Sequence, residues 1–282
     1  MSESRTKGPG ESRTKSANVP SARAVRPAAA KAKHLYVVTG ASRGLGLALV
    51  QQLAVSGNAL LCLSRTTSPA LASLARSLGV TIEQWPADLL HAGGVSARLE
   101  SWLHSYQADS LESVTLINNA GIVGRIGGVD HTTGEDLANV LRVDLEAPML
   151  LIQTFLRATR NWQCARRVIN VSSGAGRRPI AGWSPYCAAK AGLDHFTRTV
   201  ALDEAAHANG AKLVSLAPGI IDTDMQSQVR AADASGFPER QRFVDMKANK
   251  QLAAPEDAAK AVLAYLARAD FGANPVAHVS DA

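Results

Sequence analysis

Three side chains in the second half of the chain have the types and spacing of a proton-transfer site. Tyr186 and Lys190 are four residues apart in an alanine-rich run that favours a helix, so both lie on one helical face, one turn apart. A nearby ammonium favours the ionised form of a phenol and lowers its pKa from an ordinary value of about 10. A tyrosine tuned in this way can give a proton to a developing alkoxide and take it back in reverse. Ser173 follows a short apolar run and can hydrogen-bond the same substrate oxygen.

A tyrosine–lysine pair at this spacing is weak evidence alone, because many such pairs are a half-buried ring beside a surface lysine. A glycine-rich segment upstream adds a cofactor signal. Residues 35–39 predict a buried strand, and a helix follows to about Ser56. The segment between them contains Gly40, Ser42, Arg43, Gly44, Leu45 and Gly46. Its glycines permit a tight turn against a diphosphate, and the helix offers free N–H groups to that anion. The spacing differs from the G-x-G-x-x-G fingerprint, so a purely structural turn is the alternative.

The next predicted strand, residues 59–63, ends in Ser64-Arg65. Sites for NAD in this layout favour an acidic residue near that point, whereas an arginine accommodates the 2′-phosphate of NADP. Arg43 in the glycine-rich segment supplies a second cation. The sequence therefore predicts NADPH/NADP⁺ as the cofactor, against the alternative that both arginines are solvated surface charges.

Strand-like and helix-like segments alternate along the rest of the chain. Further strands are predicted near 80–85, 114–117, 167–171, 212–216 and 276–279, and helices near 69–78, 95–106, 134–145, 148–159, 184–208 and 255–267. Such alternation makes an α/β fold, a doubly wound parallel sheet of Rossmann type, here in a single domain over residues 34–282. The glycine, asparagine, serine and Pro-Gly signals all follow strands, where ligands bind in such sheets.

The net charge of +6 is confined to one end of the chain. Residues 1–33 hold eight basic and two acidic side chains, so the remainder is balanced, with 22 of each sign. A balanced body gives no electrostatic reason to expect nucleic acid as a partner. Residues 1–33 lack leucine, isoleucine and aromatic residues, which predicts a disordered basic extension. A transit peptide, a weak tether to polyanions and a misassigned start are the alternatives.

Compartment and membrane association follow from the same composition. The three cysteines, Cys62, Cys164 and Cys187, are scattered, which suits a reducing compartment and predicts a cytoplasmic protein. No apolar run approaches the length of about 20 residues that a membrane helix needs, so no membrane partner is expected. Neither the cysteines nor the histidines form a pattern that predicts a metal site.

The motifs taken together resemble the short-chain dehydrogenase/reductase family over residues 34–282. They are the glycine-rich segment, Asn118-Asn119-Ala120-Gly121, Ser173, Tyr186 with Lys190, and Pro218-Gly219. Two runs are similar to the branch that holds benzil and sepiapterin reductases, with the benzil reductase type closer. These runs are Ser173-Gly-Ala-Gly with Gly182-Trp183, and Pro218-Gly-Ile-Ile-Asp-Thr-Asp-Met-Gln226.

The resemblance implies a role for each matching position. The glycine-rich segment would line the pyrophosphate and adenosine, and Lys190 would bond the nicotinamide ribose. The other implied cofactor contacts are Asp88, Leu89, Asn119, Ala120, Gly121, Pro218, Gly219, Ile221 and Thr223. Asp144 stands where many members have a catalytic asparagine, which predicts an altered pH dependence. Ser280 stands where sepiapterin reductases carry a pterin-binding carboxylate, which weakens the pterin alternative.

The resulting prediction is an NADPH-dependent carbonyl reductase that acts on a small ketone, most specifically an aryl 1,2-diketone. Trp183 is expected to form a flat apolar wall for that substrate and Met225 to add apolar surface, although Trp183 could simply pack its loop. The alternatives are a pterin-ketone reductase, a 3-oxoacyl reductase and a catalytically silent NADP-binding redox sensor. A homodimer through helices near 134–160 and 184–208 is also expected from the resemblance.

Deleting residues 1–33 is expected to leave the melting temperature and the activity nearly unchanged, because nothing in that composition can pack. Thermal unfolding of the truncated protein measures this. A large loss of melting temperature would show that the segment docks on the body.

Overall fold

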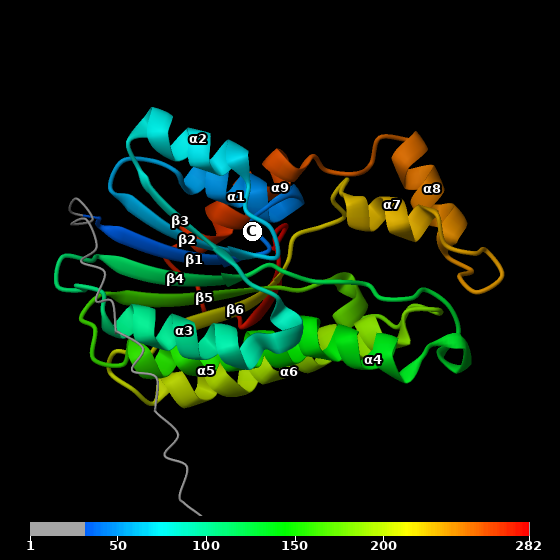
Figure 1. The fold of residues 1–282 in the computed structure, drawn as a ribbon. Coiled ribbons are helices and arrows are strands. Elements are labelled where there is room, and N and C mark those ends of the chain that lie inside the picture. Colours follow the sequence, from blue (N-terminus) through cyan, green and yellow to red (C-terminus); the bar gives the residue numbers. More distant parts are fainter. Residues whose placement is uncertain (1–31, 282) are drawn as a thin grey trace, which may run out of the picture.

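A computed structural model describes residues 32–281 and consists of one parallel sheet covered by helices on both faces (Figure 1). The strand order is β3-β2-β1-β4-β5-β6-β7. The chain therefore adds β2 and β3 on one side of β1 and the later strands, from β4 on, on the other side. The strands are β1 His34–Thr39, β2 Asn58–Ser64, β3 Thr81–Pro86, β4 Ser113–Asn118, β5 Ala165–Val171, β6 Lys212–Ala217 and β7 Val276–His278. The predicted α/β, doubly wound fold is confirmed, and each predicted strand is found within two residues of its place.

Helices α3, α5 and α6 cover one face of the sheet, and α1, α2 and α9 cover the other (Figure 1). Helices α7 and α8 lie beyond the carboxyl ends of the strands. The helices are α1 Gly44–Leu53, α2 Pro69–Leu78, α3 Ala92–His104, α4 Gly134–Leu141, α5 Ala147–Ala158, α6 Ser184–Ala205, α7 Asp224–Arg230, α8 Arg240–Ala248 and α9 Pro255–Leu266. None of these helices is both long enough and apolar enough to cross a membrane, within the part of the chain that the structure describes.

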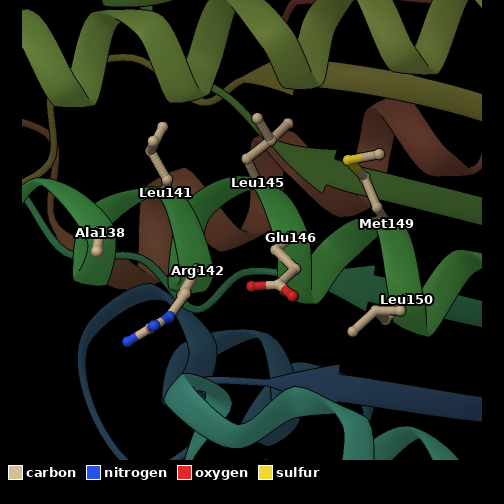
Figure 2. Close-up of a pocket in the computed structure, with 7 residues that line it drawn as sticks. All are labelled: Ala138, Leu141, Arg142, Leu145, Glu146, Met149 and Leu150. Carbon is tan, nitrogen blue, oxygen red and sulfur yellow. The ribbon is translucent and has the colours of Figure 1, made fainter.

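The two helices predicted near 134–145 and 148–159 are one continuous helical run, which corrects the expected break between them (Figure 2). Residues Arg142–Glu146 form a π-helical turn that joins α4 to α5. Pro148 explains the turn, because it has no N–H for the carbonyl of Asp144 four residues earlier and its ring crowds that carbonyl. Such π-turns concentrate at functional sites, and this one carries Asp144.

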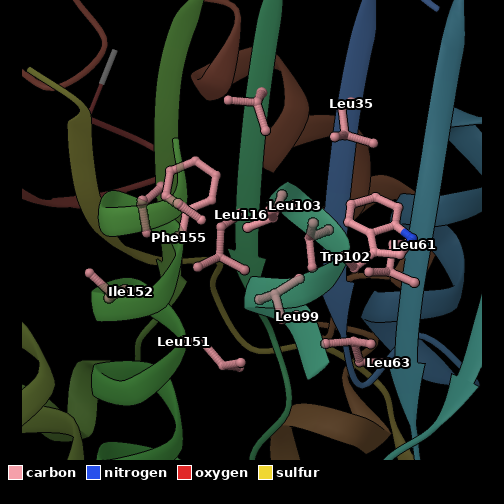
Figure 3. Packing of buried hydrophobic residues seen from close by; sticks show 14 of the residues in the cluster. Leu35, Leu61, Leu63, Leu99, Trp102, Leu103, Leu116, Leu151, Ile152 and Phe155 are labelled. Carbon is pink, nitrogen blue, oxygen red and sulfur yellow. The ribbon is translucent and has the colours of Figure 1, made fainter. Parts of the chain in front are cut away.

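The core forms two layers, one on each side of the sheet. Strand residues alternate between them: Leu35, Leu61 and Leu63 pack under α3 and α5 (Figure 3). Their neighbours Val38, Leu60 and Cys62 pack under α1 and α9. Burial on both faces explains why these strands are nearly continuous apolar runs. A rigid sheet of this kind fixes the loops at its carboxyl edge.

The ordered packing begins two residues before the predicted boundary at 34. Ala32 is buried in the core, and Lys33 donates its backbone N–H to Gly57 and accepts one from Glu112. Ala32 and Lys33 therefore belong to the folded body, whereas the rest of the predicted extension lies outside the described residues. A deletion that ends at residue 31 is now expected to leave the melting temperature unchanged, and one that ends at residue 33 to lower it.

Candidate active site

The predicted catalytic residues come together at the carboxyl ends of β4 and β5. Ser173 follows β5 and begins the turn Gly174–Gly176, whose Ala175 N–H it caps at 3.2 Å. Tyr186 and Lys190 lie in the first turns of α6, and the Lys190 Nζ is 5.5 Å from the centre of the Tyr186 ring. The Ser173 hydroxyl lies near enough to the phenol of Tyr186 to act on it, and it lowers the pKa of that phenol. The structure thus brings together the three side chains that spacing predicted.

The pKa of Tyr186 differs from the expected direction. Burial raises the pKa of this phenol above its ordinary value, and the opposing effect of the Lys190 ammonium is smaller. The prediction of a lowered pKa is therefore wrong for this structure, because spacing along a helix does not reveal how far the ring is removed from water. A raised pKa keeps the phenol protonated at neutral pH, as a proton donor must be.

Asp144 reaches the same site from the π-turn. Its Oδ2 is 3.1 Å from the Lys190 Nζ, and its Oδ1 accepts the Ile122 N–H at 2.8 Å. Burial by itself would lower the pKa of Lys190, but Asp144, Tyr186 and Asp194 together outweigh it and hold that pKa above its ordinary value. Burial likewise raises the pKa of Asp144, against the effect of Lys190. The carboxylate therefore belongs to the electrostatics of the tyrosine–lysine pair.

Asp144→Asn is expected to retain activity within about tenfold and to move the pH dependence downwards. Asp144 raises the pKa of both Lys190 and Tyr186, so loss of its charge lowers both. Carbonyl reduction needs the protonated phenol and should fall off at a lower pH, whereas alcohol oxidation needs the phenolate and should rise at a lower pH. Profiles of kcat against pH in both directions measure the shift.

Glu204→Gln is a suitable control for this variant, because Glu204 is also a buried carboxylate on α6. It pairs with Arg160 and Arg166 instead of the catalytic residues. The control should keep the wild-type pH profile. An unchanged profile for Asp144→Asn would contradict the coupling between Asp144 and the tyrosine–lysine pair.

The glycine-rich turn after β1 has the shape of a phosphate cradle. Gly40 and Gly44 have positive φ angles of 67° and 53°. A Cβ on Gly46 would lie 2.2 Å from the Gly40 carbonyl oxygen, so that position has no room for a side chain. Helix α1 begins at Gly44, and no side chain caps its N-terminus. Its N–H groups are thus left for an anion, and the turn fits the diphosphate of a nicotinamide cofactor.

The two arginines at this edge have different surroundings. Arg65 is exposed just after β2 and has no ion pair within residues 32–281. Arg43 donates to the Asp224 carboxylate at 2.8 Å, which joins the glycine-rich turn to α7. Gly40 N–H donates to the Leu63 carbonyl at 2.7 Å, so the turn lies against the end of β2. A free arginine at this end, and no acidic side chain, fit a 2′-phosphate.

Other predicted cofactor residues surround the same edge. Asn119 donates to the carbonyls of Thr39 and Gly40, and it thereby ties the end of β4 to the glycine-rich turn. Gly121 packs so close to Asp144 that an added Cβ would meet its Oδ2 at 2.9 Å. At the same edge Asp88 caps the turn after β3, and the methyl group of Thr223 faces Gly44. The remaining predicted residues at this edge are Ala120, Ser42, Pro218 and Gly219.

Leu45, Leu89 and Ile221, which are predicted cofactor contacts, have side chains that belong to the hydrophobic core. Leu89 belongs to the core layer under α3, and Leu45 and Ile221 belong to the layer under α1. These side chains support the turns that carry them. Only the backbone groups of the three residues remain as predicted cofactor contacts.

Trp183 is 5% exposed and lies inside an aromatic cluster, so it does not present the open wall that was expected. Its ring is stacked on Phe237 at 5.3 Å, lies 5.5 Å from Phe243, and meets Tyr186 edge-on at 5.6 Å. The indole holds the segment around α7 and α8 against the catalytic helix. Met225 is partly buried against this cluster. Phe237 has no role that its local sequence pattern predicts, because nothing in that pattern links it to Trp183.

Comparisons with known proteins agree with this architecture. The short chain dehydrogenase family matches residues 34–234. The chain is 34% identical to benzil reductase ((S)-benzoin forming) of Bacillus cereus over 245 residues, which cover 87% of this chain and 98% of that protein. It is 34% identical to sepiapterin reductase of Xenopus laevis over 221 residues, which cover 74% and 81%.

A solved structure shares the fold. The 3-oxoacyl-[acyl-carrier protein] reductase of Brucella melitensis in complex with NAD superposes with a TM-score of 0.73 at 23% identity, over 88% of this chain and 95% of that one. The predicted family and branch are confirmed. The chain belongs to the short-chain dehydrogenase family and is an oxidoreductase that works with a nicotinamide cofactor.

Proposed function

We propose that this protein is an NADPH-dependent reductase that converts an aryl 1,2-diketone into a hydroxyketone at one of its two carbonyl groups. The observation that carries the proposal is that Tyr186 and Lys190 are buried beside the partly buried Ser173, with the Tyr186 ring packed edge-on against an aromatic cluster. The similarity to a benzil reductase along nearly the whole of that protein supports the same reaction.

In the proposed reaction the hydroxyl groups of Ser173 and Tyr186 bind the carbonyl oxygen of the substrate. The reduced nicotinamide supplies a hydride to the carbonyl carbon when it is bound. As negative charge develops on the oxygen, Tyr186 transfers its proton to it, and the product is the alcohol. Lys190 stabilises the phenolate that remains until solvent returns a proton. Water is kept from Tyr186 by the aromatic cluster on one side.

The cofactor would be held by groups along the carboxyl edge of the sheet. The N–H groups at the start of α1 would bind the diphosphate, and Arg65 the 2′-phosphate, with Arg43 as the second cation. Lys190 would also bond the nicotinamide ribose. Asn119, Ala120 and Gly121 would line the central part of the site.

A neutral substrate suits the surroundings of Tyr186. Partly buried apolar side chains lie around the aromatic cluster: Ile122, Ile126, Ile220 and Met225. The two arginines near the site are engaged elsewhere, since Arg177 donates to the Ala277 carbonyl and Arg178 forms a bidentate pair with Glu239. Arg177 and Arg178 are therefore not free to bind a substrate carboxylate. This supports a diketone over an acidic substrate.

The second candidate is reduction of a pterin ketone, which the similarity to sepiapterin reductase favours. At the position where the resemblance predicts a pterin-binding carboxylate, this chain has Ser280. That serine is exposed, and its hydroxyl is bonded to the His278 ring at 2.7 Å. A hydroxyl engaged in its own turn is a poor substitute for a carboxylate, so we rank the diketone first.

The test is a side-by-side measurement of kcat/KM for benzil and sepiapterin with NADPH, followed by its absorbance. We expect the diketone to be reduced faster and to yield a single hydroxyketone. The Tyr186→Phe protein is the control for turnover that does not use the site. A clear preference for sepiapterin would overturn the substrate assignment and leave carbonyl reduction standing.

We propose that the protein is a homodimer through the outer face of α4 and α5. The groove on this face is lined mostly by apolar side chains of the helical run, and Arg142 and Glu146 also line it (Figure 2). Neither charge has an ion-pair partner within the described residues. A twofold axis would let each pair with the opposite charge of a second copy, which is the pattern of a self-complementary interface.

Met149→Glu is expected to convert such a dimer to monomer in light scattering, because it places a charge in the groove. Leu78→Glu is the matched control, since Leu78 is an exposed apolar residue on α2, on the opposite side of the sheet. A wild-type protein that is monomeric at micromolar concentration would contradict the proposal.

Unpaired thiols at Cys62, Cys164 and Cys187 support the proposed cytoplasmic location.

A further inference from the structure

Asp194 is a buried carboxylate that the proposed reaction does not use. It lies on α6, one turn after Lys190, and is 2% exposed. Its Oδ1 accepts hydrogen bonds from the hydroxyl groups of Ser172 and Ser215, both at 2.6 Å. Its Oδ2 has no hydrogen-bond partner within the described residues and faces the Arg177 Nε at 3.7 Å. Burial of a charge is unfavourable unless it is paired, so this arrangement requires an explanation.

The partners of Asp194 come from each segment that surrounds the catalytic serine. Ser172 is the residue before Ser173 at the end of β5, and Ser215 lies on the neighbouring strand β6. Arg177 follows the turn after Ser173 and also donates to the Ala277 carbonyl on β7. The helix of Asp194 itself carries Tyr186 and Lys190. One carboxylate thus joins both halves of the catalytic set.

The packing at this joint leaves little freedom. A Cβ on Gly176 would lie 3.0 Å from the Asp194 Oδ2 and 3.0 Å from the Lys190 carbonyl, so the turn after Ser173 rests directly on α6. Lys190 also donates to the Val171 carbonyl at 3.1 Å, two residues before Ser173. These contacts between α6 and the segment around Ser173 therefore set the distance between Ser173 and Tyr186.

We propose that Asp194 is a positioning residue of this site. Through its hydrogen bond with Ser172 it holds Ser173 in place beside Tyr186, and its own carboxylate is the second one near Lys190, after that of Asp144. The proposal rests on carbonyl reduction by this site. Catalysis is sensitive to such placement, because a shift of about 1 Å in a reacting group can lower a rate about 100-fold. The charged groups that face Lys190 are Asp144, Tyr186 and Asp194, and those that face Asp194 are Lys190 and Arg177.

Two serine variants separate positioning from simple support of the fold. Ser172→Ala and Ser215→Ala each remove one hydrogen bond of equal length to the same oxygen of Asp194, and both serines are nearly fully buried. They differ in that only Ser172 adjoins the catalytic serine. We expect Ser172→Ala to lower kcat about tenfold with KM for NADPH within about twofold, and Ser215→Ala to change kcat by no more than about twofold. Thermal unfolding of both proteins should show similar losses.

A third variant tests the charge of Asp194. Asp194→Asn keeps the shape and one acceptor, and the loss of its charge beside Lys190 should move the alkaline fall of kcat to lower pH. Glu204 is a buried carboxylate on the same helix but away from the site, so Glu204→Gln should leave the alkaline fall of kcat at its wild-type pH. If Asp194→Asn does not fold, the serine pair still decides the question.

All rates are measured with the carbonyl compound that the wild-type protein reduces fastest. If that compound is not a diketone, the proposed substrate fails while the role of Asp194 can still be judged. Equal kcat for Ser172→Ala and Ser215→Ala would overturn the positioning role, whichever substrate is used. A wild-type protein that reduces no carbonyl compound would overturn both.

Discussion

Tyr186→Phe is expected to lower kcat by about 100-fold or more while NADPH still binds, because it removes the proton donor and keeps the ring. The phenyl ring retains the edge-on contact with Trp183 at 5.6 Å, so the aromatic cluster should remain packed. The hydroxyl group is the part of Tyr186 that gives the proton, whereas the ring carries the packing contacts. Its loss should therefore affect the chemical step more than the stability of the fold.

The measurement is kcat by single-turnover or steady-state absorbance, together with NADPH affinity by fluorescence. Tyr265→Phe is the matched control: Tyr265 is also a largely buried tyrosine, but it lies on α9 against Phe271. That variant should keep the wild-type rate. Ser173→Ala should cost less than Tyr186→Phe if the serine orients the carbonyl. Wild-type turnover by Tyr186→Phe would move the chemistry elsewhere and favour the silent NADP-binding alternative.

NADPH is expected to be preferred over NADH by one to three orders of magnitude in kcat/KM. A hydrogen bond to a charged group contributes about 1.5–3 kcal/mol, and a factor of ten corresponds to about 1.4 kcal/mol. Arg65 is free to make such a contact with a 2′-phosphate, whereas Arg43 must exchange its exposed pair with Asp224. Exposed pairs of that kind contribute only about 0.2–1 kcal/mol, so the exchange is not prohibitive.

Arg65→Ala should therefore reduce kcat/KM for NADPH strongly and that for NADH little. Arg76→Ala is the control, because Arg76 is an exposed arginine on α2 that does not lie at the carboxyl end of a strand. Equal efficiency of the wild-type protein with both cofactors would contradict the assignment of the 2′-phosphate site. An effect of Arg65→Ala that is the same for both cofactors would show that the arginine serves the fold or the diphosphate.

The sequence by itself determined most of the secondary structure and the parallel sheet, and it selected the side chains of the proposed catalytic set. Those features follow from local rules: buried parallel strands are short apolar runs, glycines mark the turn after β1, and residues four apart share a helical face. The family motifs lie at the carboxyl ends of strands, so their sequence positions already predict that Ser173, Tyr186 and the glycine-rich turn meet at one edge. The continuity of α4 and α5 was missed, and α7 and α8 were not predicted as separate helices.

The tertiary structure decided the properties of the site that depend on distant segments. Burial of Tyr186 outweighs the charge of Lys190, which reverses the expected direction of its pKa. Trp183 is covered by Phe237, and Arg43 is paired with Asp224, a residue 181 positions away. Desolvation and ion pairing are sums over everything that packs around a group, and no local pattern contains them. For that reason spacing could identify the reacting side chains, but only the packed fold could show how each one is charged, shielded and held.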